Sequence, residues 1–266
     1  MSALSGAVAD AFVVARRNVI KIVRVPEVLV FVLIQPILFV LLFAYVFGGS
    51  IEIPGLSYRE FLIAGIFAQT VVFGATFTGA GIAEDMTKGI MDRFRSLPMS
   101  RSAVLVGRTL SDVIYNVLSL FVMAIAGLLV GWRIRGSLLD AVIAFALILF
   151  FAYAISWIMA LVGLLVPSVE VVQNASFIFI FPMTFIANTF VPSDDLPGPL
   201  QVIAEWNPVS TVTQVGRERF GNLPPDAPEP DAWPLQNPEL YTLGVSVVII
   251  AIFATLAIRR FAASGS

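Results

Sequence analysis

Six long stretches almost free of charged side chains alternate along the sequence with short segments that hold most of the charge. A hydrocarbon core about 30 Å thick needs roughly 20 helical residues, so each stretch is long enough to cross a bilayer as a helix. Continuous apolar runs such as Phe39–Phe43 exclude a membrane barrel, whose strands alternate apolar and polar positions. We therefore predict an all-α polytopic membrane protein with six spans, at residues 28–51, 61–83, 108–132, 141–166, 171–191 and 240–258.

The composition supports the same class. Of the 266 residues, 58% are hydrophobic and only 13% are charged, and the mean hydropathy is +0.92. An average soluble domain carries about twice that share of charge. The absence of Cys and His excludes disulfides, Cys or His catalysis, and thiolate or imidazole metal sites. The sequence also holds no nucleotide-binding P-loop, HExxH zinc motif or GxSxG elbow. We therefore expect no catalytic residue, no metal and no cofactor on this chain, so that any ATP and Mg it depends on would bind a partner subunit.

The basic residues divide unequally between the two sides that six spans create. Four precede the first span, five lie between the second and third spans, and two follow the sixth, which places eleven on the side of the termini. The other side holds five, among many acidic residues. Because Lys and Arg gather in cytoplasmic loops, this predicts a multi-pass protein of the inner (plasma) membrane with both termini in the cytoplasm.

The segment before the first span, residues 1–26, predicts an amphipathic helix. Val8, Phe12, Ala15, Val19 and Ile22 recur at helical spacing, while basic residues occupy its other faces. Such a helix is typical of the inner headgroup layer, with its apolar side toward the lipid. An ordinary solvated helix beside a membrane anchor is the alternative.

The cytoplasmic loop at residues 84–104 carries a second amphipathic pattern. Met86, Ile90, Phe94 and Leu97 form an apolar stripe at spacings of four, four and three, and Pro98 stops the helix. A short, sharply ended cytoplasmic helix of this kind suits a groove on a soluble partner. Packing of the same stripe against headgroups or neighbouring helix ends explains the pattern equally well.

The outer segment at residues 192–239 is acidic and rich in proline, which excludes one long helix. Leu196, Leu200 and Ile203 predict one short helix. Asn207 and Pro208 are a favourable N-cap and first position for a second, which we expect to run to about Phe220. These half-helices suit either an outer gate or a purely structural cover.

Polar side chains inside the spans are amides and hydroxyls rather than carboxylates. Candidates for a translocation path are Gln35, Gln69, Asn116, Asn174 and Asn188. The same residues could instead hydrogen-bond helices to one another. Asp112 and Glu170 are expected near cytoplasmic helix ends, within reach of water and arginine, so the pattern disfavours a proton-coupled pump.

Two motifs in this order resemble the type 2 ATP-binding-cassette (ABC) exporter permeases, in particular their daunorubicin/doxorubicin-resistance type. In the first, Gly89, Arg93, Pro98 and Arg101 match the family's cytoplasmic loop. The second runs from Phe190–Pro192 through Leu196–Pro197 and Asn207–Val209 to Arg217, and is similar to the family's outer re-entrant helices.

The resemblance implies a pump of two permease chains, identical or different, and two separate ATPase subunits. It implies ATPase-coupling residues Glu84, Asp85, Lys88, Gly89, Ile90, Asp92, Arg93, Phe94, Arg95, Leu97, Pro98 and Arg101. It implies outer-gate residues Pro192, Leu196, Pro197, Asn207, Pro208 and Arg217. The expected function is export of an amphipathic drug-like or lipid-like compound. A polysaccharide or glycolipid exporter of the same architecture, a non-transporting membrane scaffold and an ion-coupled transporter are the alternatives.

Overall fold

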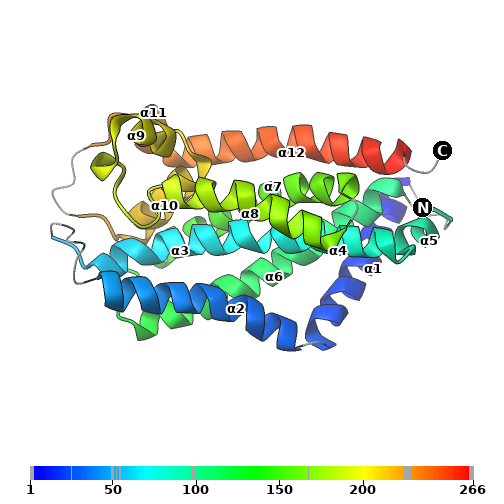
Figure 1. Cartoon of the computed structure of the whole chain (residues 1–266), viewed down its shortest axis with the longest axis horizontal. Helices are drawn as coiled ribbons and strands as arrows, with labels where there is room; N and C mark the ends of the chain where they lie inside the picture. The colour runs from blue at the N-terminus through cyan, green and yellow to red at the C-terminus, as the bar shows by residue number, and fades with distance from the viewer. Residues whose placement is uncertain are drawn as a thin grey trace.

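A computed structural model describes residues 3–24, 26–48, 51, 53, 55–96, 100–166, 168–224 and 229–263. The long helices run side by side along one axis (Figure 1). Both chain ends and α5 lie at one end of this bundle, here the terminal end, while α9, α10 and α11 lie at the other, here the distal end.

The helix bounds are α1 Ala3–Arg24, α2 Pro26–Leu41, α3 Tyr58–Gly74, α4 Thr76–Thr87, α5 Ile90–Ser96, α6 Arg101–Leu129, α7 Leu138–Leu165, α8 Val169–Ile186, α9 Gly198–Glu205, α10 Pro208–Phe220, α11 Trp233–Gln236 and α12 Pro238–Ala263. A π-helix, η1 (Leu42–Phe47), continues α2, and a 3-10 turn, η2 (Ser193–Asp195), precedes α9.

The prediction of an all-α polytopic membrane protein is confirmed. Five helices among the described residues are long and apolar enough to cross a membrane, namely Tyr58–Thr87, Ser102–Leu129, Leu138–Leu165, Val169–Ile186 and Pro238–Ala263. A shorter apolar helix, Ile34–Val46, occupies the region of the first predicted span. The third of the predicted spans belongs to a longer helix, because α6 already begins at Arg101.

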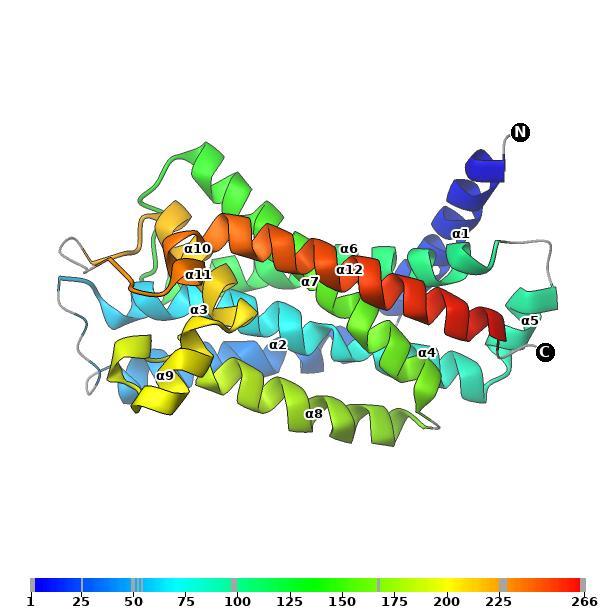
Figure 2. The same cartoon turned by 90° about the horizontal axis from the view of Figure 1, so that it is seen from above.

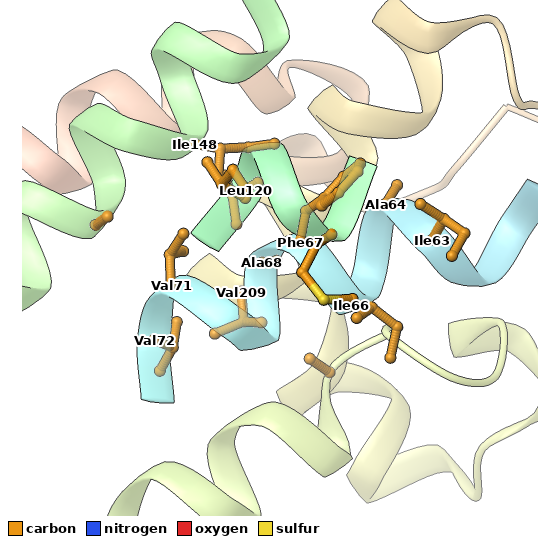
Figure 3. Close-up of a cluster of buried hydrophobic side chains, with 14 of the residues drawn as sticks. Ile63, Ala64, Ile66, Phe67, Ala68, Val71, Val72, Leu120, Ile148 and Val209 are labelled. Atoms are coloured by element: carbon orange, nitrogen blue, oxygen red, sulfur yellow. The ribbon is translucent and has the colours of Figure 1, made fainter. Parts of the chain in front are cut away.

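The second span forms the centre of the bundle. Of its most apolar stretch, 78% is buried, compared with 17% for α12, which runs along one margin (Figure 1). Figure 3 shows apolar side chains of α3, such as Phe67, beside Leu120 of α6, Ile148 of α7 and Val209 of α10. A helix surrounded on every side by other helices can be apolar all round, which explains why α3 shows no polar face.

Glycines let α4 and α7 cross at backbone contact. A Cβ atom added to Gly163 of α7 would collide with the carbonyl oxygen of Gly79 in α4. Small residues at such crossings are the usual basis of tight helix packing in membranes. This contact therefore holds α4 firmly against α7.

Helix α1 crosses the terminal end of the bundle obliquely (Figures 1 and 2). It packs on α6, where a Cβ atom on Gly107 would lie 2.5 Å from the carbonyl oxygen of Ala11. The single apolar stripe predicted for α1 is wrong, because Ala15 is buried in the protein whereas Phe12 is 66% exposed. The helix thus presents one apolar face to α6 and leaves Phe12 exposed on another.

The predicted apolar stripe between Met86 and Leu97 does not lie on one continuous helix. Helix α4 ends at Thr87 and α5 begins at Ile90. Between them Gly89 has a φ of +65°, a conformation that costs energy for any residue with a Cβ atom. The spacing rule fails here because it takes no account of this turn.

Candidate functional site

A cavity of about 430 Å³ lies among α2, α3, α4, α6 and α8, near the middle of the long helices. Its lining residues are Gln35, Pro36, Phe39, Gln69, Thr70, Phe73, Gly74, Thr76, Phe77, Tyr115, Gln173, Ser176, Phe177 and Ile180. Four of these are phenylalanines, and none is Asp, Glu, Lys or Arg. The volume falls within the range of pockets that hold drug-sized ligands. The cavity therefore suits an uncharged guest with a large apolar surface.

Two of the five amides proposed for a path, Gln35 and Gln69, line this cavity. Asn116 lies behind its wall, since its Oδ1 would be 2.9 Å from a Cβ atom on Gly74. Asn174 is exposed on α8, and its neighbour Gln173 occupies the cavity wall instead. Asn188 is buried near the distal end, outside the cavity lining.

Some polar groups in and beside the cavity have hydrogen-bond partners within the protein, and others have none. The hydroxyls of Thr70 and Ser176 donate to carbonyls of their own helices, at 2.7 and 2.6 Å. Among the described residues, the buried Nε2 of Gln69 and Oδ1 of Asn116 have no hydrogen-bond partner. An unsatisfied buried polar group costs roughly 1–3 kcal/mol. Of the two, Gln69 belongs to the cavity lining, so its amide is the one that a guest or a water molecule would satisfy on binding.

The helices around the cavity depart from regular α-helix. Pro36 in α2 and Pro182 in α8 each remove a backbone donor. Helix α2 loosens into η1, and α3 is separated from α4 at Ala75. Kinks at proline and π-helical turns are common where helices must bend or carry function. The cavity is thus bounded by helices whose regular hydrogen bonding is interrupted.

At the terminal end, α1 is joined to the predicted coupling segment. Arg17 donates to the Oδ2 of Asp85 at 2.7 Å, and its guanidinium lies 5.0 Å from the centroid of the Phe94 ring. Lys88 pairs with Glu84 one turn earlier, at 2.6 Å, and this hydrogen bond raises the pKa of Lys88. Sequence reasoning missed Arg17, because no local pattern relates α1 to α4 and α5.

The other predicted coupling residues lie on or near α5. Asp92 and Arg93 are exposed and Ile90 is half-buried. The buried Met91 of the same helix joins the apolar cluster of α4, α6, α7 and α12. Arg95 and Arg101 occupy helical positions, but the described part of the structure does not include their side chains. Leu97 and Pro98 lie outside the described residues.

Asp112 is in a different environment from the one expected. Its side chain is buried, accepts a hydrogen bond from Thr78 Oγ1 at 2.6 Å and lies 3.9 Å from Arg108. Arg108 also donates to the carbonyl of Phe77 at 2.9 Å. The expected access to water is therefore wrong, although the expected arginine is present. The carboxylate helps to hold α6 against the start of α4.

At the distal end, Asn207 caps α10 as the sequence predicts. Its Oδ1 accepts from the backbone N–H of Val209 at 2.9 Å, and Pro208 is the first helical residue. The Nδ2 of the same amide donates to the carbonyl of Met183 in α8 at 2.7 Å. Pro192 and Leu196 are half-buried on either side of η2, and Pro197 is exposed before α9. The cap thus also ties α10 to α8.

Arg217 of α10 is 1% exposed and connects three elements. Its guanidinium donates to the carbonyls of Phe61, Asn188 and Thr189 at 3.1, 2.7 and 3.3 Å, and it lies 3.4 Å from the centroid of the Phe61 ring. Burial lowers the pKa of Arg217 to about 9, so the group stays protonated at pH 7. The predicted gate residue therefore anchors α10 to the start of α3 and to the chain after α8.

Known proteins match most of this chain. Residues 10–218 match the ABC-2 type transporter family. The daunorubicin resistance ABC transporter permease protein DrrB1 of Streptomyces coeruleorubidus is 33% identical over 236 residues, which cover 89% of this chain and 80% of that protein. The probable doxorubicin resistance ABC transporter permease protein DrrC of Mycobacterium tuberculosis is 24% identical over 67% of this chain and 64% of its own length. A putative transport permease of Cyanophora paradoxa, ycf38, is 23% identical over 76% of this chain and 70% of its own length.

Proposed function

Because this chain belongs to the ABC-2 type transporter family, as a permease subunit of an ABC exporter that pairs with an ATPase subunit, we propose that it exports an uncharged amphipathic compound of drug or lipid type. The cargo would enter the cavity between α2, α3 and α8 from the cytoplasm or the inner leaflet. It would leave toward α9 and α10. The names of the daunorubicin and doxorubicin resistance relatives support an amphipathic drug as the cargo.

The cavity is the observation that carries the proposal. Its phenylalanines offer an apolar surface, and the amide of Gln69 offers a donor that the protein leaves unsatisfied. A guest with an apolar body and a few polar groups matches both features. A volume of about 430 Å³ suits a small compound.

The second span supplies a mechanical connection to the ATPase. Gly74, Thr76 and Phe77, at the junction of α3 and α4, line the cavity, and α4 ends beside α5. A push on α5 would therefore reach the cavity wall through α4. Closure of two ATPase subunits on ATP would in this way bias the cavity between two arrangements.

The proposal includes a topology and an assembly. The terminal end faces the cytoplasm and both chain ends lie there, as the distribution of basic residues indicates. Two permease chains in the plasma membrane would combine with two ATPase subunits. Those subunits would bind ATP and Mg, and this chain would hold no cofactor and no ATPase site of its own.

The test is ATP-dependent efflux by the permease with its ATPase, together with co-purification of the two. Gly89→Pro removes the positive φ of the turn before α5, and Arg93→Glu reverses an exposed charge on α5. We expect both variants to lose at least tenfold in efflux and to bind the ATPase weakly. Arg259→Glu, the same charge change at an exposed site of α12 at the same end, is the control and should transport normally. Unchanged efflux and ATPase binding in both variants would refute the coupling role of α5.

A further inference from the structure

A second hollow, separate from the cavity, is a groove between α6 and α7. Its volume is about 210 Å³, and its lining residues are Val117, Leu120, Phe121, Ala124, Phe145 and Leu149. All of these are apolar, and none of them lines the cavity. Leu120 is 3% exposed and Phe121 is 63% exposed, so the groove has a buried floor and an open edge. On two membrane-spanning helices, such an edge faces lipid or another chain.

The shape of this groove suits a chain rather than a compact molecule. Pockets for drug-sized ligands have volumes of about 300–1,000 Å³, which is larger than this groove. Its wall is fixed by the core, because the ring of Phe145 lies 5.4 Å from that of Phe67 and 5.1 Å from that of Phe220, measured between centroids. The groove is therefore a preformed apolar channel of the width of a flexible hydrocarbon chain.

An arginine, Arg133, lies at the distal mouth of the groove. Its Nη1 donates to the carbonyls of Leu128 and Trp132, at 2.7 Å each. Leu128 is one helical turn beyond Ala124 on the same face of α6, which is a rise of about 6 Å. The exposed guanidinium thus lies just beyond the end of the apolar lining.

Arg133 differs from the other arginines at this end in its partners. Each of the others pairs with a carboxylate or lies over an aromatic ring, namely Arg59, Arg135, Arg217 and Arg219. In the part of the chain that the structure describes, Arg133 meets neither, and only its Nη1 donates hydrogen bonds. Its Nε and Nη2 therefore remain for a ligand. A guanidinium binds phosphate oxygens well because it presents two parallel N–H donors.

We propose that the α6–α7 groove binds an acyl chain of an anionic phospholipid from the leaflet at the distal end, and that Arg133 binds the phosphate of the same lipid. The groove occupies the distal halves of α6 and α7, so a chain in it points into that leaflet while the headgroup stays at the surface. A net negative headgroup is favoured because no carboxylate neutralises Arg133 among the described residues. This lipid is a bound component of the permease and not its cargo, so the inference does not rest on the proposed export function.

The experiment uses native mass spectrometry of the full-length permease, purified in detergent and stripped of lipid. It measures which lipid the protein takes up from an equal mixture of dioleoylphosphatidylglycerol and dioleoylphosphatidylcholine, which share acyl chains and differ in headgroup charge. We expect the wild type to prefer phosphatidylglycerol. Arg133→Gln should reduce that preference roughly three- to tenfold, because a charge-assisted pair is lost. Arg133→Lys keeps the charge without the planar fork and should recover part of it.

Two further variants separate the groove from general effects. Ala124→Phe fills the groove and should lower the uptake of both lipids, whereas Ala251→Phe makes the same change at an exposed site of α12 and should lower neither. Arg259→Gln removes an exposed charge at the terminal end and should keep the wild-type preference.

A wild type without preference, or an Arg133→Gln variant with the wild-type preference, would overturn the inference. So would an equal loss in Arg259→Gln, which would assign the preference to net charge alone. If Ala124→Phe converted a dimer into a monomer and left lipid uptake intact, the groove would be an interface between two copies of this chain and the inference would be wrong. None of these results bears on the export function.

Discussion

Two arginines, Arg217 at the distal end and Arg17 at the terminal end, each join helices far apart in the sequence, but they do so in opposite ways. Arg217 is 1% exposed and donates to three backbone carbonyls. The side chain of Arg17 is 38% exposed and pairs with one carboxylate, that of Asp85. A buried group that satisfies several others is costly to remove, whereas an exposed ion pair contributes little to stability.

The surroundings of the two arginines strengthen this contrast. Beside Arg217, the indole N–H of the buried Trp132 donates to the Oδ1 of Asn222 at 2.7 Å, and the Nδ2 of Asn222 donates to the carbonyl of Arg133. Beside Arg17 lie the turn at Gly89 and the short helix α5. The distal end is therefore an anchor of buried hydrogen bonds, and the terminal end is a more exposed joint between α1, α4 and α5.

Replacing Arg217 tests the anchor and should have the largest effect. Arg217→Ala leaves three carbonyls without their donor, so we expect a loss of about 3–5 kcal/mol in the free energy of unfolding. Thermal melting in detergent should show it as poor yield or a strongly lowered midpoint. Arg217→Lys keeps the charge but not the planar fork, and should recover only part of the loss. A midpoint within one degree of wild type for Arg217→Ala would contradict the anchoring role.

Replacing Asn222 tests a second contact of the same anchor. In Asn222→Ala the buried indole N–H of Trp132 loses its acceptor, for an expected cost of about 1–2 kcal/mol. The midpoint of thermal melting should fall, and so should protection of the indole from solvent, measured by fluorescence quenching. Trp132→Phe removes the indole donor, so the acceptor on Asn222 then contributes less to stability. The double variant should therefore cost less than the sum of the two single changes.

Replacing Arg17 tests the joint. Here we expect coupling to the ATPase to fall without a comparable loss of stability. We expect Arg17→Ala to change the free energy of unfolding by less than about 1 kcal/mol, because the pair is partly exposed. Efflux and the stimulation of the ATPase should nevertheless fall severalfold, since α1 no longer holds Asp85 and Phe94. The exchange of Arg17→Asp with Asp85→Arg should restore part of the coupling. If stability and coupling fell in parallel, Arg17 would be an anchor like Arg217.

The smallest effect is expected at Lys88. Its pair with Glu84 is a surface contact between neighbouring helical turns, with 60% of the lysine side chain exposed. Lys88→Ala should leave the melting midpoint unchanged within error and transport normal. A loss of ATPase binding in this variant alone would show that Lys88 contacts the partner directly.

The sequence predicted features that depend on neighbouring residues. The N-cap at Asn207, the start of α10 at Pro208 and its end at Phe220 followed from local capping preferences, and the structure confirms them. The turn at Gly89 was missed, because apolar spacing alone does not distinguish one helix from two. Apolar spacing also failed for α1, where Phe12 and Ala15 face different surroundings.

The candidate site was predictable only in part. Sequence reasoning selected Gln35 and Gln69 as polar residues within spans, and both line the cavity. It also selected Asn174, although Gln173 is the residue on the cavity wall. Adjacent helical residues point about 100° apart, so polarity alone does not say which one faces inward. The role of these amides in transport stays a prediction.

The sequence by itself determined that this is a helical membrane protein, because lipid offers no hydrogen bonds and each span must satisfy its backbone within its own helix. The family resemblance likewise rests on short motifs that can be read along the chain. Only the tertiary structure decided which helices surround the cavity and which arginine is buried. Those features depend on contacts between residues far apart in the chain, such as Arg217 and Phe61, whose meeting is set by packing of the whole bundle.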